Sequence, residues 1–130
     1  MSAVVVDTNV VSYLLRNHPL AVRYEPHLRG TLLAISFMTL AEVLYGGTSA
    51  GWNRQRLVRA EATLRSRYLI VPSTRSVCVQ WGEIRVERRA RAISHADAWI
   101  AATARAYGWP LVTHDANDFA GISNLIVLTE

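Results

Sequence analysis

The 130-residue sequence has no lysine and a single cysteine, Cys78. One cysteine excludes an internal disulfide and a cysteine-ligated metal site, and the neighbours Val77, Val79 and Trp81 predict a buried thiol. Hydrophobic residues make up 51% of the chain, but no apolar run approaches the roughly 20 residues that a membrane-spanning helix needs. No secretory leader pattern opens the sequence. We therefore expect a soluble, cytoplasmic protein that forms one domain over residues 1–130.

Acidic residues are also scarce. There are 10 of them against 14 arginines, and the only aspartates are Asp7, Asp97, Asp115 and Asp118. Each aspartate stands at the end of an expected strand or helix. If the four aspartates and Glu42 form one site, the rest of the chain carries 14 arginines and five glutamates. An acidic pocket within a basic protein suits a polyanion that is bound together with cations.

Apolar runs and helical spacings alternate along the chain. Val4, Val5 and Val6 follow one another without polar alternation, which is typical of a strand covered on both faces in a parallel sheet. Further strands are expected at residues 31–37, 68–71, 111–113 and 126–128. Helices are expected at residues 10–16, 20–28, 37–47, 52–67, 74–92 and 94–108. The alternation predicts an α/β fold built on a parallel sheet.

Capping residues suggest where the helices begin and end. The expected caps are Thr8 or Asn9, Ser36 or Thr39, and Ser94 at helix starts, with Gly46, Gly47 and Gly108 at helix ends. Thr39 and Glu42 have the spacing of a capping box, and Asp97 stands at the same position relative to its cap. Glu42 and Asp97 therefore each have a purely structural explanation.

The joint arrangement of the acids favours chemistry. Asp7 and Asp115 each follow an expected strand, and Glu42 and Asp97 lie in the first turns of helices near the same edge, where ligands of open α/β sheets bind. Carboxylates gathered in a small volume stay ionised only when cations neutralise them. Oxygen ligands without cysteine or paired histidine predict Mg²⁺, with Mn²⁺ as a substitute. Such a centre activates water for phosphodiester hydrolysis.

Four motifs, VVVDTN, TLAEVLYG, ADAWIAATA and LVTHDANDF, resemble those of the PIN-domain nucleases, and particularly the VapC toxins of bacterial toxin–antitoxin pairs. The resemblance covers nearly the whole chain. It implies one PIN domain over residues 1–130, with a five-stranded parallel sheet between helices. It also implies a Mg²⁺-dependent endoribonuclease that cleaves cellular RNA such as tRNA or rRNA, forms a homodimer and is inhibited by a VapB-type antitoxin.

The same resemblance assigns roles to eight residues. The catalytic and metal-binding quartet is matched by Asp7, Glu42, Asp97 and Asp115, and the supporting polar positions are matched by Thr8, Asn9, Thr113 and Asp118. One departure lies in the segment RARAIS at residues 89–94, where many relatives carry a glycine. This departure affects the expected substrate entry and leaves the quartet intact.

Two alternatives remain open from the residues. The segment DTN resembles the nucleophile strand of haloacid-dehalogenase-like phosphatases, although Asn9 stands where that scheme needs a second acid. A catalytically inactive PIN-like module that binds RNA or an antitoxin would use the acids only for structure. Candidate contacts with RNA phosphates are Arg85, Arg88, Arg89 and Arg91.

Overall fold

The computed structural model describes residues 2–130 and contains a five-stranded parallel sheet with the strand order β3-β2-β1-β4-β5. The strands are β1 (Ala3–Val6), β2 (Leu32–Ser36), β3 (Leu69–Val71), β4 (Leu111–Val112) and β5 (Val127–Leu128). The helices are α1 (Thr8–Leu15), α2 (Ala21–Leu28), α3 (Phe37–Ser49), α4 (Arg54–Arg67), α5 (Arg75–Glu87), α6 (His95–Tyr107) and the short 3₁₀ helix η1 (Ala116–Phe119). The α/β fold and the five expected strands are confirmed.

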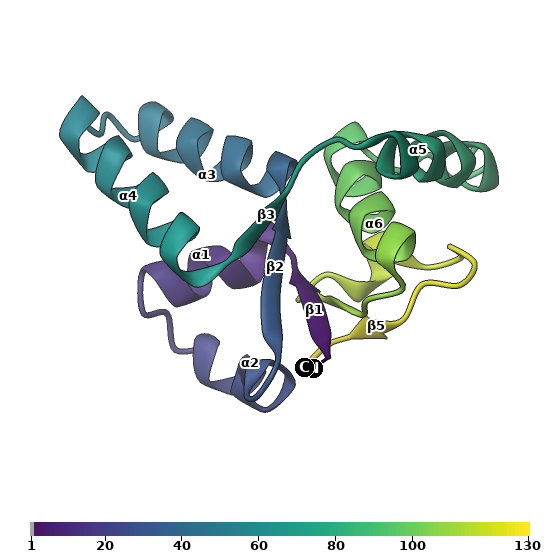
Figure 1. Ribbon diagram of the computed structural model, residues 1–130, viewed down its shortest axis with the longest axis horizontal. Helices are drawn as coiled ribbons and strands as arrows, with labels where there is room; N and C mark the ends of the chain where they lie inside the picture. The colour runs from purple at the N-terminus through teal and green to yellow at the C-terminus, as the bar shows by residue number, and fades with distance from the viewer. Residues whose placement is uncertain (1) are drawn as a thin grey trace.

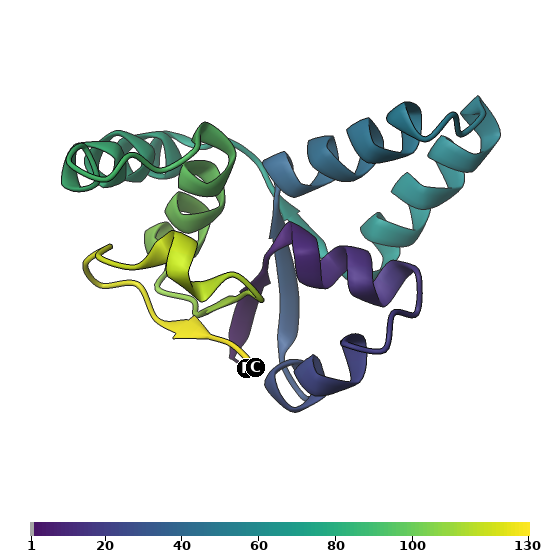
Figure 2. The same cartoon turned by 180° about the vertical axis from the view of Figure 1, so that it is seen from behind.

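The sheet is covered on both faces, as its apolar first strand predicts. Val5 packs into a core with α5, α6 and η1, whereas Val4 and Val6 pack into a second core with α1 to α4. All three valines are at most 4% exposed. Figures 1 and 2 show the two groups of helices on opposite sides of the strands, with α3 and α4 forming a hairpin that extends away from the sheet.

The helix α6 lies close against the sheet because its inner face is made of small residues. Ala98, Ala101, Ala102 and Ala104 are fully buried. The expected limits of this helix are confirmed, since Ser94 is its N-cap and Gly108 ends it with a φ of 67°. The close packing holds the first turn of α6 near the carboxyl ends of β1 and β4.

Two expected helix limits are wrong. The N-cap of α1 is Asp7, not Thr8 or Asn9, so the carboxylate that ends β1 also begins the next helix. The helix α3 does not stop at Gly46 and Gly47 but continues to Ser49. A Cβ atom at Gly47 would lie 2.4 Å from Cε3 of Trp52, so this glycine lets α3 and α4 approach each other instead of ending the helix.

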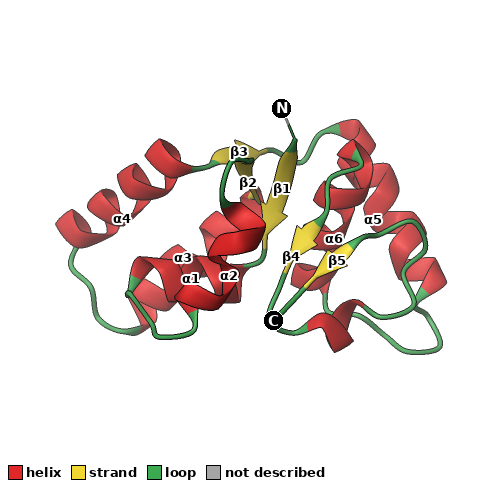
Figure 3. Cartoon of the chain, turned by 90° about the horizontal axis from the view of Figure 1, so that it is seen from below, coloured by secondary structure: helices red, strands yellow, loops and turns green. Residues whose placement is uncertain are grey.

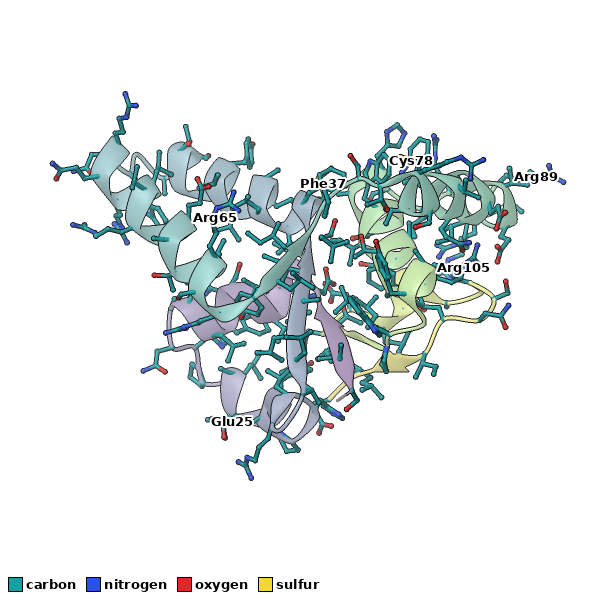
Figure 4. The ribbon with its side chains drawn as sticks, viewed as in Figure 1. Glu25, Phe37, Arg65, Cys78, Arg89 and Arg105 are labelled. Atoms are coloured by element: carbon teal, nitrogen blue, oxygen red, sulfur yellow. The ribbon has the colours of Figure 1, made fainter. Side chains whose placement is uncertain are left out.

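The region around α5 differs from expectation in three ways. The helix ends at Glu87 instead of residue 92, because Arg88 is its C-cap and turns back onto a neighbouring loop. Arg88 is buried, with 6% of its surface exposed. Cys78 is exposed and not buried, because Val77 and Ile84 occupy the face of α5 that points to the core; Figure 4 shows Cys78 on the outer side of the helix. No helix of residues 2–130 has the length and apolar character needed to cross a membrane.

Candidate functional site

The carboxyl ends of β1 and β4 place most of the predicted site residues at one edge of the sheet. These two strands pair in parallel, with Val6 beside Val112, and Figure 3 shows the arrows of β1, β4 and β5 pointing in the same direction. Asp7 therefore stands next to Thr113 in space although 106 positions separate them in the chain.

Asp7 is the most restrained acid of this edge. Its Oδ1 accepts a hydrogen bond from the backbone N–H of Thr8 at 2.8 Å, and its Oδ2 accepts one from the hydroxyl of Thr113 at 2.6 Å. The pKa of Asp7 is raised from 3.8 to about 6, mainly by burial and to a smaller extent by the charges of Asp97 and Glu42, against the opposing effect of these two hydrogen bonds. The site therefore holds a carboxylate that a positive charge would stabilise.

Glu42 projects from α3 toward the start of α1. Its Oε1 accepts a hydrogen bond from the hydroxyl of Thr8 at 2.7 Å, and the same hydroxyl lies 3.0 Å from that of the buried Thr39. The expected capping box between Thr39 and Glu42 is therefore wrong, because Ser36 caps α3 and Glu42 bonds across to α1. The spacing of three residues instead places both side chains on the face of α3 that meets Thr8.

Asp115 is held from two sides. Its Oδ2 accepts a hydrogen bond from Nδ2 of Asn9 at 3.1 Å, and its backbone N–H donates to the hydroxyl of Thr113 at 3.0 Å. Thr113 thus contacts two of the predicted acids, since it donates to Asp7 and accepts from Asp115. His114 is half-buried, and its Nδ1 is hydrogen-bonded to the hydroxyl of Tyr24.

Asp97 faces the other acids from the first turn of α6. The pKa of Asp97 is raised, with burial as the largest cause, while a hydrogen bond with the Ser94 side chain opposes the rise. The negative charges of three further acids, Asp118, Glu42 and Asp115, raise it again. The structure therefore brings all five predicted acids into one electrostatically coupled group.

None of the site acids is neutralised by a basic side chain in the described chain. The ion pairs of residues 2–130 engage the five glutamates outside the site, which are Glu25, Glu61, Glu83, Glu87 and Glu130. Unpaired, mutually repelling carboxylates suit a hard divalent cation such as Mg²⁺. The acids lie at the same edge of the sheet, but their side chains are not yet arranged as metal ligands. Among residues 2–130, no group of three histidine, cysteine, aspartate or glutamate residues is placed so that it could hold a metal ion.

Comparison with known proteins gives the same class of fold. The PIN domain family matches residues 4–125, and the chain belongs to this family. Ribonuclease VapC1 of Haemophilus influenzae (strain R2866) is 30% identical over 123 residues, which cover 92% of this chain and 91% of that protein. The tRNA(fMet)-specific endonuclease VapC of Shigella flexneri is 29% identical over 121 residues, covering 92% and 91%.

A solved structure supports the similarity over the full chain. The complex VapBC2 from Rickettsia felis, bound to a DNA fragment from their promoter, contains a chain that superimposes with a TM-score of 0.83 at 28% identity and covers 98% of each chain. Within the PIN-domain family, the protein is thus similar to VapC ribonucleases.

Sequence reasoning missed two contributors to the site. Thr39 was interpreted only as a helix cap, although its spacing from Glu42 also indicates a shared helix face. The guanidinium of Arg88, a candidate phosphate contact, also donates to the carbonyl oxygens of Arg91, Asp118 and Ala120, and these structural contacts were not predicted. The helical spacing of Arg88 from Val77 and Ile84 does predict that it shares their side of the helix, and Arg88 is buried.

Proposed function

We propose that this protein is a Mg²⁺-dependent endoribonuclease, the toxin of a VapBC-type toxin–antitoxin system. The observation that carries the proposal is the group of unpaired carboxylates at the carboxyl edge of β1 and β4, in a chain whose relatives bear the names ribonuclease and endonuclease. A cellular RNA, with tRNA or rRNA as the expected class, is the substrate.

Asp7, Glu42, Asp97 and Asp115 are the residues that would hold the cation. A bound Mg²⁺ lowers the pKa of a water molecule and stabilises charge on the phosphate oxygens. The protein contributes orientation: Thr113 and the N–H of Thr8 fix both oxygens of Asp7, so this carboxylate cannot rotate away from the site. Glu42, Asp97 and Asp115 would supply further oxygen ligands to the cation.

Two hydrogen-bonded pairs hold two of the other acids at this edge of the sheet. Thr8 holds Glu42, and Asn9 holds Asp115. Neither acid is paired with an arginine in residues 2–130, so both carboxylates would be available to the cation. Attack by water needs no 2′-hydroxyl, so the expected products carry a 5′-phosphate and a 3′-hydroxyl.

The proposed partner that controls this activity is a VapB-type antitoxin. Solved relatives include VapBC complexes, and a co-expressed antitoxin is expected to bind this chain and suppress cleavage. A homodimer and a cytoplasmic location are further expectations, which analytical ultracentrifugation and cell fractionation would test.

Incubation of the purified protein with total cellular RNA tests the proposal. We expect cleavage with Mg²⁺ or Mn²⁺, loss of cleavage with EDTA, and loss of cleavage in Asp7→Asn. Cleavage that ignored EDTA and survived Asp7→Asn would overturn the metal-nuclease proposal. Binding of RNA without cleavage under every metal condition would instead support the inactive binding module.

A further inference from the structure

A second feature lies beside the acidic edge and shares Asp97 with it. A cavity of about 330 Å³ lies among the segment that joins α5 to α6, the start of α6 and η1, and its walls include Arg88, Arg91, Ser94, Asp97 and Asp118. Its volume falls within the range of roughly 300–1,000 Å³ that is usual for ligand sites. Asp97 borders this cavity, so anything bound there lies next to the proposed metal ligands.

Arg88 presents unused hydrogen-bond donors at this cavity. Its Nε donates to the carbonyl oxygen of Arg91 at 2.8 Å, and its Nη1 donates to those of Asp118 at 2.9 Å and Ala120 at 3.0 Å. These acceptors are neutral, and Nη2 bonds no residue of the described chain. Arg88 as a whole is 6% exposed, but Nη2 is not among the buried side-chain atoms of residues 2–130 that lack a partner, so this donor is accessible to solvent or to a ligand in the cavity.

Arg91 adds a second guanidinium from the same segment. Its Nη2 donates to the carbonyl oxygen of Asn117 at 3.0 Å, which orients the side chain and leaves its Nε and Nη1 free. Arginines and aspartates line one cavity here, yet none of the ion pairs found in residues 2–130 joins them. The carboxylates thus remain available for a cation and the guanidiniums for an anion.

The chemistry of this pair selects a phosphate. Forked N–H donors of two arginines match the oxygens of a phosphodiester, and the hydroxyl of Ser94 adds a further polar group. We propose that the cavity binds the RNA phosphate next to the cleaved bond. The exposed Arg91 and the buried Arg88 would both donate hydrogen bonds to this phosphate. This inference rests on the proposed ribonuclease function and specifies how the substrate lies across the site.

The test compares Arg91→Gln with Arg89→Gln. Both variants remove one exposed arginine from the same segment, but Arg89 does not line the cavity and points away from the body of the protein in Figure 4. The probe is a short fluorescent single-stranded RNA, and anisotropy is measured over a series of salt concentrations. An Asp7→Asn background prevents cleavage.

We expect Arg91→Gln to weaken RNA binding about 10- to 100-fold, the usual value of a charge-assisted hydrogen bond. The slope of log Kd against log salt is expected to fall by about 0.7, as for one lost phosphate contact on a single strand. Arg91→Lys is expected to restore the salt slope while recovering only part of the affinity, since an ammonium keeps the charge without the fork. Arg89→Gln is expected to change both quantities much less.

Kinetics with an otherwise unchanged active site separate this inference from the proposed function. We expect Arg91→Gln to raise KM while kcat stays close to that of the parent protein. Equal effects of Arg91→Gln and Arg89→Gln would overturn the cavity as a phosphate site, as would unchanged RNA binding together with weaker antitoxin binding. If Asp7→Asn abolishes cleavage while Arg91→Gln changes nothing, only this inference fails; if Asp7→Asn cleaves normally, the proposed nuclease function itself fails.

Discussion

Replacing Asp7 by asparagine is expected to stabilise the protein at neutral pH in the absence of divalent cations, although it removes the proposed activity. The reason is that Asp7 is ionised at neutral pH in a place that disfavours its charge. Burial, as well as the charges of Asp97 and Glu42, raises its pKa to about 6. Asparagine has the same shape and caps helices as well as aspartate does.

The size of the effect follows from the pKa values. A tenfold change in proton affinity corresponds to about 1.4 kcal/mol, so moving the pKa from 3.8 to about 6 gives an unfavourable contribution of about 3 kcal/mol once Asp7 is fully ionised. Asparagine keeps the acceptor for the N–H of Thr8 but not the acceptor for the Thr113 hydroxyl. That loss is about 1 kcal/mol, so a net gain of about 2 kcal/mol remains.

The gain is expected to depend on pH with a definite sign. The folded protein binds the proton of Asp7 more tightly than the unfolded chain does, so the contribution of Asp7 to stability is lost as pH rises from about 4 to about 6 and is constant above that. Urea denaturation in EDTA, near pH 4 and near pH 7.5, measures the difference between parent and variant. Near pH 4, we expect the free energy of unfolding of Asp7→Asn to be no higher than that of the parent. Near pH 7.5, we expect it to be about 2 kcal/mol higher.

Glu25→Gln is the control, because Glu25 is exposed and lies 3.6 Å from Arg29 in a surface ion pair, which contributes at most about 1 kcal/mol. Its effect is expected to be small at both values of pH. Addition of Mg²⁺ is expected to raise the stability of the parent protein and not that of Asp7→Asn. A variant that is less stable than the parent by the same amount at every pH would refute the reasoning.

Three further predictions concern the neighbouring residues and the reaction. Thr113→Val removes the hydroxyl donor to Asp7, so the pKa of Asp7 rises further and the acidic limb of the pH–rate profile is expected to move to higher pH; Thr113→Ser is the control and should keep the parent profile. Arg88→Ala leaves three carbonyl acceptors without their donor and is expected to lower the free energy of unfolding by about 3 kcal/mol or more, whereas Arg89→Ala is expected to change it by less than about 0.5 kcal/mol. Mass spectrometry of cleaved RNA is expected to find 5′-phosphate and 3′-hydroxyl ends, and a 2′,3′-cyclic phosphate would contradict attack by water.

The central strand and the small-residue helix could be predicted from sequence because local patterns determine them. Three consecutive valines require cover on both sides, and the buried alanines of α6 together with Ser94 and Gly108 define that helix with little help from the rest of the chain. Both features position acids, which is why the grouping of Asp7 and Asp97 at one edge followed from the sequence.

The errors arose where a residue serves a distant segment. Glu42 satisfies the local spacing of a capping box, but Ser36 already caps α3 and the free carboxylate bonds to Thr8, 34 positions away. The sequence alone predicts that Gly47 ends a helix, but the structure shows that this position must be glycine-sized because Trp52 packs against it. Local propensity can indicate what such residues are able to do, whereas tertiary contacts decide which of these options is used.

The contact between Gly47 and Trp52 has an evolutionary consequence. Both residues line the groove of about 320 Å³ that runs beside Glu42, and the indole occupies the volume that a methyl group at position 47 would need. The size of the side chain that fits at position 47 therefore depends on the side chain at position 52. In descendants of this chain, any larger residue at position 47 is expected to coincide with a smaller one at position 52, since changing either alone would alter the width of the groove.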